Sequence, residues 1–386
     1  MPITSPLVRG IRAWWPRAAT LLLAAAALAT MSSATNEPAK STGPWEVHEV
    51  LTGAAVPTND VPPSLRGTYD WYLFANHCHS GYSRDSSADL AELMAGAAAR
   101  GADAFSLNDH GTYEGCDDPA FQQIGDMIPI CGEEWSGVQG GSDAPHAVVL
   151  NVPSTMPHMT GWPIADMIEE VHAAGGSVIA NHPFMIGLGW PEDRLSPGID
   201  GVEVWNGTGA FARNSLALAW WQEHLAEGRR ITGMGGTDIH EASRNALAPC
   251  NYVLARSPNP DDIQDAVNEG RVGISKNETG PRVYLWADLD GALPYDIPMG
   301  TNIELASAAD VYVRVRVTGG EGEAISLHIH DRQIWSGNVN ADPWELRASA
   351  RLGPQRRTLL RAELRSGPRN GLDALSNPIY VNYPDD

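Results

Sequence analysis

Lysine is nearly absent from this chain of 386 residues, and basic residues as a class are scarce. Only Lys40 and Lys276 occur, and 26 Lys and Arg residues stand against 47 Asp and Glu, which gives a formal charge of −21. A nucleic-acid partner needs basic side chains that neutralise its phosphates, so this balance argues against one. It argues equally against attachment to an anionic membrane surface.

Long apolar runs are also missing, because nothing after residue 34 approaches the ~20 apolar residues of a membrane span. The one short apolar run, Leu21–Ala29, follows three arginines and precedes the small residues Ser32, Ser33 and Ala34. This order is typical of a secretory signal peptide, and the run is too short for the alternative, a membrane anchor. We therefore predict a signal peptide over residues 1–34 and a secreted or periplasmic protein without a membrane partner after cleavage.

Cysteine is sparse, and no Cys-x-x-Cys pair occurs among Cys78, Cys116, Cys131 and Cys250. A cysteine zinc knuckle is thereby excluded, whereas export would permit disulfides. Cys116 and Cys131 form the favoured pair, because both lie near one expected strand and the loop before it. Buried free thiols are the alternative.

The remaining sequence divides into three parts. Residues 35–65 are rich in Pro, Thr and small polar residues and indicate an N-terminal arm or linker. In residues 66–280 short apolar runs alternate with helical patterns, which predicts βα units and a mainly parallel sheet or barrel. The expected strands are Tyr72–Ala75, Ala104–Leu107, Met127–Ile130, Ala147–Val152, Ser177–Ala180, Gly201–Val204, Ile231–Met234 and Tyr252–Ala255. The expected helices are Ala88–Arg100, Ile164–Ala174, Arg213–Glu227 and Asp261–Glu269.

Residues 281–386 show a different pattern, in which apolar and polar residues alternate with a period of two and no convincing helix occurs. The segment Asp310–Val317 (DVYVRVRV) is the clearest strand pattern. We predict a small all-β sandwich domain for this part.

Six histidines and several acids border the expected strands of residues 66–280. In a parallel barrel the carboxyl ends of the strands meet at one mouth, so these side chains are expected to converge there. Imidazole together with carboxylate suits zinc, manganese or iron, and the set exceeds the ligands that one zinc needs. A multinuclear metal site is therefore predicted. Its candidates are His77, His79, His110, Glu133, Glu134, His146, His182, Asp238 and His240.

Two other patterns in the sequence could indicate metal sites. His328 and His330 also have His-x-His spacing, but they lie in the β domain without a carboxylate cluster nearby, so we assign them no metal. Amidohydrolase barrels also begin with His-x-His, yet they commonly bridge two metals with a modified lysine from a central strand. Lys40 lies in the arm and Lys276 lies beyond Asp238, so the chain has no lysine for that role.

The stretches NHCHSGYSRDS, LNDHG, CGEEWS, APHAVVLNV, VIANHP and GGTDIH, in this order, resemble the PHP (polymerase and histidinol phosphatase) family. EVWNG and the late NPIYV are similar to its secreted, carbamate-hydrolase-like branch. The resemblance covers residues 71–280 and implies a distorted seven-stranded (β/α) barrel that holds two to three divalent metal ions (Zn, Mn or Fe).

The resemblance also implies which residues bind each ion. His77, His79, Glu134 and Asp238 would hold the first. Glu134 would bridge to a second ion on His146 and His182, and it is preferred to Glu133 because an apolar residue and Ser follow it. The third ion would take His110, His240 and an acid from the loop after His79. In this sequence the family position of that acid falls on Arg84. Either a one-residue insertion lets the adjacent Asp85 serve as the ligand, or the third site is weak, and we favour Asp85.

We therefore predict a metal-dependent hydrolase, most simply a phosphoesterase that acts on a small phosphorylated ester through a hydroxide bridging two ions. Glu134 and Asp238 would support the reaction through the metals. Arg84 would neutralise phosphoryl charge, unless it is a solvated loop residue, and His240 or Asp109 would orient groups or protonate the leaving oxygen. A carboxylic or carbamate ester hydrolase, or a non-catalytic metal-containing binding protein, is the alternative.

Overall fold

The computed structural model describes residues 44–56, 60–122, 125–137, 144–190, 195–242, 247–367 and 371–384. The expected signal peptide, residues 1–34, lies outside the described residues. Within the described ranges, no helix has the length and apolarity needed to cross a bilayer.

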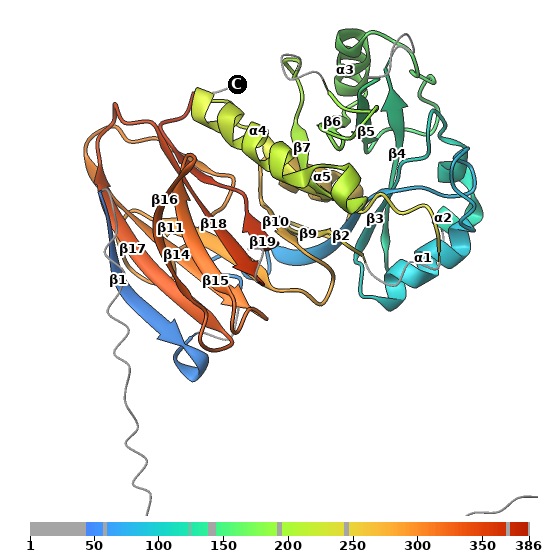
Figure 1. The fold of residues 1–386 in the computed structure, drawn as a ribbon. Coiled ribbons are helices and arrows are strands. Elements are labelled where there is room, and N and C mark those ends of the chain that lie inside the picture. Colours follow the sequence, from blue (N-terminus) through green and yellow to red (C-terminus); the bar gives the residue numbers. More distant parts are fainter. Residues whose placement is uncertain are drawn as a thin grey trace, which may run out of the picture. The chain divides into compact units, whose positions relative to one another are not determined.

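Strands are the main regular structure of the described chain, and they form two sheets (Figure 1). The strands that surround the candidate site are β2 (Asp70–Cys78), β3 (Ala104–Leu107), β4 (Ile128–Ser136), β5 (His146–Leu150), β6 (Ser177–Ala180), β7 (Gly201–Asn206), β8 (Thr232–Gly236), β9 (Cys250–Ala255) and β10 (Val272–Ser275). The other strands are β1 (Trp45–Thr52), β11 (Arg282–Asp288), β12 (Ile297–Pro298), β13 (Asn302–Ile303), β14 (Ala309–Thr318), β15 (Ala324–Ile329), β16 (Arg332–Asn338), β17 (Trp344–Leu352), β18 (Thr358–Ser366), β19 (Gly371–Ser376) and β20 (Ile379–Val381).

Helices are few in the described ranges. They are α1 (Leu90–Ala99), α2 (Pro119–Gln122), α3 (Ile164–Ala173), α4 (Asn214–Glu227) and α5 (Pro260–Asn268), with short 3-10 turns at Gly53–Ala55, Glu114–Asp117 and Gly209–Phe211.

The predicted seven-stranded (β/α) barrel is wrong. The larger sheet is a curled, mixed sheet that runs β13-β20-β18-β19-β10-β9-β2-β3-β4-β5-β6-β7-β8, and β15 and β16 extend it beside β18. The pairs β2–β3, β3–β4, β6–β7 and β7–β8 are parallel, whereas β4–β5, β5–β6, β2–β9 and β9–β10 are antiparallel. A parallel crossover takes a dozen or more residues, and residues 137–145 between β4 and β5 are too few for one.

The curl of this sheet brings its strands β2 and β8 together at the end that carries the candidate site. Backbone hydrogen bonds join Thr237 N to Asn76 O (2.8 Å) and Asp238 N to His77 O (2.8 Å), and His79 N binds Ile239 O (2.9 Å). The segment after β8 therefore lies against the end of β2, although the two are far apart in sequence.

The second sheet is antiparallel and has the order β1-β17-β14-β11-β12. It packs on the part of the curled sheet formed by β15, β18, β19 and β20, and one apolar core fills the space between them. The alternation in β14 explains its place, because Val311, Val313, Val315 and Val317 all point into this core. On the opposite face of β14, buried Arg314 pairs with Glu345 at 2.7 Å.

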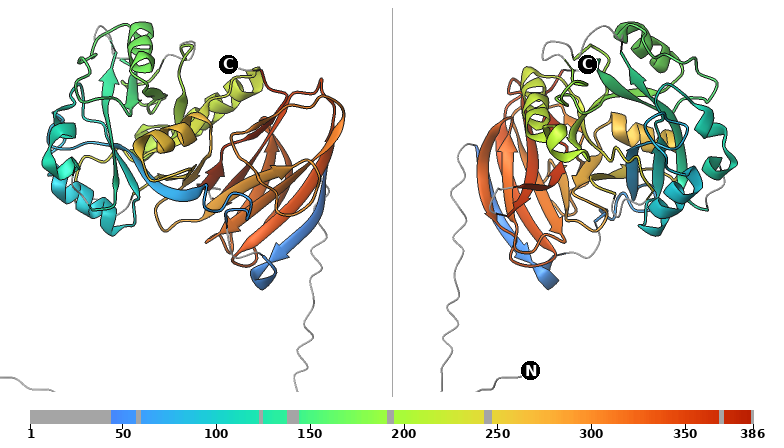
Figure 2. Two further views of the ribbon diagram at one scale, coloured as in Figure 1. Left: turned by 180° about the vertical axis from the view of Figure 1, so that it is seen from behind. Right: turned by 45° about the vertical axis from the view of Figure 1, so that its right-hand side comes forward.

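Two features cross the boundaries expected from sequence. Part of the expected arm forms β1, which pairs with β17 along the outer edge of the antiparallel sheet (Figure 2). The larger sheet also continues through the expected boundary at residue 280, because β10 pairs with β19 in the register Ile274 to Leu375. The described residues 44–384 accordingly lie within one compact unit.

Candidate metal centre

The candidate site lies where several strands of the curled sheet end. A register shift in β2 between Ala75 and Cys78 turns the backbone, so that His77 and His79 both reach inward. His77, His182 and Asp238 have positive φ angles of 65°, 25° and 49°. Such angles are uncommon for non-glycine residues and concentrate at functional sites.

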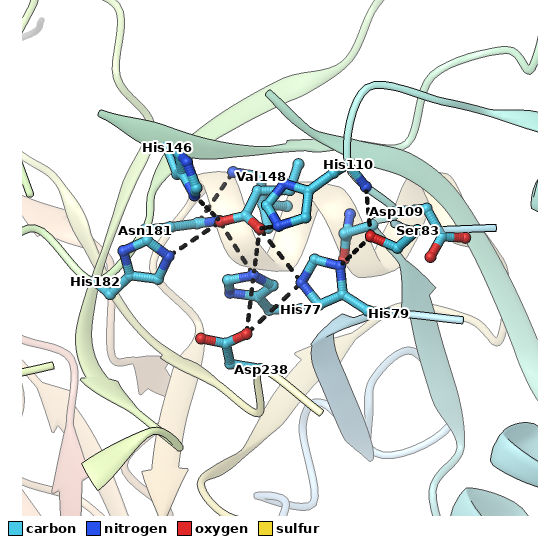
Figure 3. A network of polar contacts seen from close by, with 12 residues as sticks. His77, His79, Ser83, Asp109, His110, His146, Val148, Asn181, His182 and Asp238 are labelled. Atoms are coloured by element: carbon cyan, nitrogen blue, oxygen red, sulfur yellow. Dashed lines mark hydrogen bonds and ion pairs between the residues drawn. The ribbon is translucent and has the colours of Figure 1, made fainter. Parts of the chain in front are cut away.

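Glu134, two residues before the end of β4, is the centre of the site. It is 1% exposed, and its Oε2 lies 3.3 Å from Nε2 of His77, 3.3 Å from Nε2 of His79 and 3.1 Å from Nε2 of His110. Its Oε1 lies 3.1 Å from Nδ1 of His146 and 3.1 Å from Nε2 of His182. The imidazoles of these five histidines converge from different strand ends (Figure 3).

Asp238 closes the buried side of the site. Its Oδ1 lies 3.8 Å from Nε2 of His77 and 3.6 Å from Nε2 of His79. It also lies 3.4 Å from Nδ1 of His240, which is only half-buried. Asp238 therefore links the buried histidines to the exposed rim.

Asp85 organises that rim. Its Oδ2 lies 3.1 Å from Nε2 of His110 and 3.1 Å from Nε2 of His240, and Ser83 Oγ donates to its Oδ1 at 2.8 Å. The loop is fixed further by Ser86, whose Oγ contacts the backbone oxygens of His79 and His240. The structure thus brings Asp85 into the cluster.

Arg84, by contrast, is exposed, and its side chain makes no hydrogen bond or ion pair within the described part of the chain. Of the other candidates, Asp109 accepts hydrogen bonds from Ser80 N (2.6 Å) and Ser80 Oγ (2.7 Å). These two bonds hold the loop after His79 in place. Glu133 points away from the site, towards Tyr113, and burial raises its pKa to about 7.

Among the described residues, four groups of side chains have ligand atoms within 4.8 Å of one another and could hold metal ions. They are His77, His79 and Glu134; His77, His182 and Asp238; His110, Glu134 and His146; and His79, Asp85, His110 and His240. Shared members make the groups one continuous cluster.

The charges of these groups depend on one another. Burial alone would raise the pKa of Glu134, but His77, His110 and His146 outweigh it and hold the pKa below its usual range. Burial alone would lower the pKa of His110, but Glu134 and Asp85 raise it to about 9. Burial dominates at His79, whose pKa falls to about 4, so this imidazole is neutral near pH 7.

Two buried nitrogen atoms test whether the cluster fits metal ions. His79 Nε2 and His182 Nδ1 have no hydrogen-bond partner among the described residues. His79 Nε2 nevertheless lies close to oxygens of both Glu134 and Asp238, and a neutral imidazole offers a lone pair there. Neutral imidazole nitrogens beside carboxylate oxygens are the donor set of divalent transition-metal ions, so the residues fit such ions.

A second layer holds the ligands in place, and sequence reasoning assigned its main member no role. Glu203 is fully buried; its Oε1 lies 2.6 Å from His77 Nδ1, and its Oε2 accepts from His182 N at 2.9 Å. Asn206 Nδ2 binds Glu203 Oε2 at 2.9 Å and Asp238 Oδ2 at 3.1 Å. Carboxylates behind ligating histidines fix ring orientation and basicity in metal sites.

No sequence pattern marks Glu203. Its close fit with Gly236, where a Cβ would collide with the Glu203 carboxylate, is visible only in the folded chain. Asn181 is the other second-layer residue: its Nδ2 donates to Glu134 Oε1 at 2.8 Å, and its Oδ1 accepts from Val148 N at 3.0 Å.

Comparisons with known proteins give no identity. No protein-family model matches the chain, and no curated protein matches it.

Proposed function

We propose that this chain is an exported, metal-dependent hydrolase that acts on ester bonds, with phosphoric esters as the first choice. The observation that carries the proposal is the environment of Glu134, one buried carboxylate contacted by five imidazoles. Five imidazole rings, of which that of His79 is neutral near pH 7, gather more nitrogen donors around Glu134 than its hydrogen bonding requires, and imidazole with carboxylate is the donor set of divalent transition-metal ions.

The residues divide between a buried part and an exposed part. His77, His79, Glu134 and Asp238 would hold one ion, and His146 and His182 would share Glu134 with a second. The half-buried His110 and His240 with Asp85 would hold a third at the rim. When bound, divalent ions lower the pKa of water and polarise an ester oxygen.

The protein groups around these ligands then have separate tasks. Glu203 holds the ring of His77 and the backbone of His182, and Asn181 holds the Glu134 carboxylate. His240 contacts Asp85 and Asp238 and would orient groups at the rim or protonate the leaving oxygen. Arg84 is exposed beside Asp85, where its guanidinium can reach an anionic substrate from solvent.

The order of the ligand motifs along the chain also supports membership of the PHP family, which we propose on that resemblance alone. Export is proposed from the signal-type N-terminus. The disulfide between Cys116 and Cys131 supports it, because disulfides persist in oxidising compartments. Cys78 and Cys250 are free and buried.

The decisive experiment is elemental analysis of the protein purified without added metal, followed by assays with aryl phosphate and aryl ester panels with and without Mn²⁺ or Zn²⁺. Two to three equivalents of metal and hydrolysis of phosphate esters are expected. Hydrolysis of carboxylic or carbamate esters alone would replace the phosphoesterase proposal. Metal without turnover would indicate a binding protein, and absence of metal would overturn the site.

Glu134→Gln tests the role of the central carboxylate. Loss of its charge is expected to remove activity and reduce bound metal, while circular dichroism shows a folded chain. Glu92→Gln, an exposed change on α1, is the matched control and should behave as the unmodified protein. A fully active Glu134→Gln protein would contradict the proposal.

A further inference from the structure

A second polar cleft lies apart from the metal centre, between α4 and the strands β15, β16, β18 and β19. Its volume is about 710 Å³, within the range of small-molecule sites. Strand β7 separates the two places: Glu203 and Asn206 face the metal centre, whereas Val204 and Trp205 line the cleft. Its lining includes Trp205, Ser326, His328, Arg361, Glu363 and Arg365.

Arg361, on β18, lines this cleft and is 0% exposed. Its Nη1 donates to Glu363 Oε1, but Nε and Nη2 have no hydrogen-bond partner in the described part of the chain. These two nitrogens form one edge of the guanidinium group, with two N–H bonds that point the same way. That edge matches the two oxygens of a carboxylate.

Glu363 cannot supply the missing acceptor, because both of its oxygens are already engaged. Arg365 donates to Oε2 from Nε at 2.8 Å, and Gln222 Nε2 donates to Oε1 at 3.3 Å. Two guanidinium groups therefore share one carboxylate. Asp331 also lines the cleft and acts on Arg361, so what an anion would satisfy is the unpartnered Nε and Nη2 edge of Arg361 rather than a net charge.

His328 adds an unused acceptor next to this edge. It is the direct cross-strand partner of Arg361, so the two side chains share one face of the sheet. Ser326 Oγ donates to the Glu363 carbonyl (3.3 Å) and so accepts from His328 Nε2 (2.9 Å). The ring proton of His328 is therefore on Nε2, and the free lone pair of the ring is on Nδ1. This nitrogen is buried and has no hydrogen-bond partner among the described residues.

We propose that the cleft binds a hydroxylated carboxylic acid of sugar-acid size, with its carboxylate on the Arg361 edge and a hydroxyl donating to His328 Nδ1. The volume of the cleft accommodates such a molecule, and Trp205 provides an aromatic wall for its ring. This site is independent of the proposed hydrolase activity.

Isothermal titration calorimetry on the full chain tests the proposal, with D-glucuronate as the probe. D-glucose keeps the hydroxyls without the carboxylate, and acetate keeps a carboxylate without hydroxyls. Saturable binding of one glucuronate is expected, with glucose and acetate at least tenfold weaker. No saturable binding of glucuronate would overturn the proposal, and acetate binding of equal strength would overturn its hydroxyl part.

Variants locate the binding. Arg361→Gln should weaken glucuronate binding at least tenfold, whereas the exposed Arg351→Gln should leave it unchanged. Ala219→Trp, on the exposed side of α4, fills the cleft without touching Arg361 and should also abolish binding. Glu223→Trp on the same helix lies outside the cleft and is its control, and this pair decides the matter if Arg361→Gln does not fold.

Glu134→Gln separates the cleft from the metal centre, where a carboxylate could bind as a metal ligand. Unchanged glucuronate affinity in this variant is the expected result. Loss of binding in Glu134→Gln, or full binding in a folded Ala219→Trp protein, would place glucuronate elsewhere and refute the assignment.

Discussion

A buried imidazole beside a carboxylate shares either a proton or a cation with it, and the surroundings decide which. At His77 the Nδ1 atom faces Glu203 and the Nε2 atom faces Glu134, so both ring nitrogens are engaged. The ring of His79 is neutral near pH 7, and no described residue donates a hydrogen bond to its buried Nε2. The two histidines are only two residues apart, yet their environments favour opposite protonation.

Glu203→Gln tests the layer behind the ligands. The amide keeps the shape of the side chain but removes the charge that orients His77, so metal affinity should fall about 10- to 100-fold. Competition with a chelator such as a zinc-sensing dye measures this. An unchanged affinity in a folded protein would mean that Glu203 only fills space, and the exposed Glu223→Gln variant provides the baseline.

His328 makes stability depend on pH. Burial, together with the nearby Arg361, lowers its pKa from the usual 6.5 to about 4. Below pH 6.5 the unfolded chain therefore takes up a proton that the folded chain refuses until about pH 4, so folding stability falls across this window. The loss is on the order of 2–3 kcal/mol, at about 1.4 kcal/mol for each pKa unit.

Urea unfolding at pH 7 and at pH 4.5 measures this loss. His328→Gln cannot take up the proton in either state, so the variant should lose less stability between the two pH values than the unmodified chain. Equal losses in both proteins would show that His328 does not contribute.

Sequence patterns located individual elements of this protein well. The expected strands Ala104–Leu107 and Ser177–Ala180 have the bounds of β3 and β6, and the expected Ile164–Ala174 helix differs from α3 by one residue. These are local properties: apolar runs, helical periodicity and flanking Gly residues. The direction in which strands pair is not a local property. Strand β5 pairs antiparallel with both β4 and β6, so the sheet is mixed and not the expected parallel barrel.

The candidate site was predictable for a related reason. Ligand-type residues follow strands, and strand ends meet wherever the sheet curls, whichever way the strands run. Sequence patterns do not indicate a role for Glu203, because it lies within a strand among the apolar residues Val202, Val204 and Trp205. Only its three-dimensional neighbours, His77 and Asn206, reveal its role.

The disulfide Cys116–Cys131 is the main covalent constraint at the level of elements. It joins the 3-10 turn at Glu114–Asp117 to β4, three residues before Glu134, and closes a loop with a sequence separation of 15. A loop of this size is worth about 3 kcal/mol of unfolding free energy. Reduction should therefore lower stability by about that amount.

Urea denaturation with and without dithiothreitol checks this value. The double variant Cys116→Ser and Cys131→Ser is the control, since Cys78 and Cys250 are free thiols and reductant should not affect it. A dithiothreitol effect that persists in the double variant would contradict the assignment.

On the scale of the whole molecule, the strands around the candidate metal centre and the strands β15, β18, β19 and β20 that pack on the antiparallel sheet belong to one sheet. A chain that ends at residue 280 would lose β19. The edge of β10 that pairs with β19 would then be unpaired, and its residues, all buried in the full chain, would be exposed. We expect residues 44–280 to be insoluble or unfolded when expressed alone, whereas residues 44–384 fold. A soluble 44–280 fragment with cooperative unfolding would contradict this view.

The pairing of β1 with β17 has a consequence for biosynthesis. Glu49 and Arg347 are joined by an ion pair, although 298 positions separate them in the chain. When β1 leaves the ribosome its partner has not been made, and its edge stays open during most of translation. Contacts of such long range slow folding and leave strand edges exposed to other chains. Chaperones that shield the nascent segment around Trp45–Thr52 would therefore raise the yield of native protein more than those acting late.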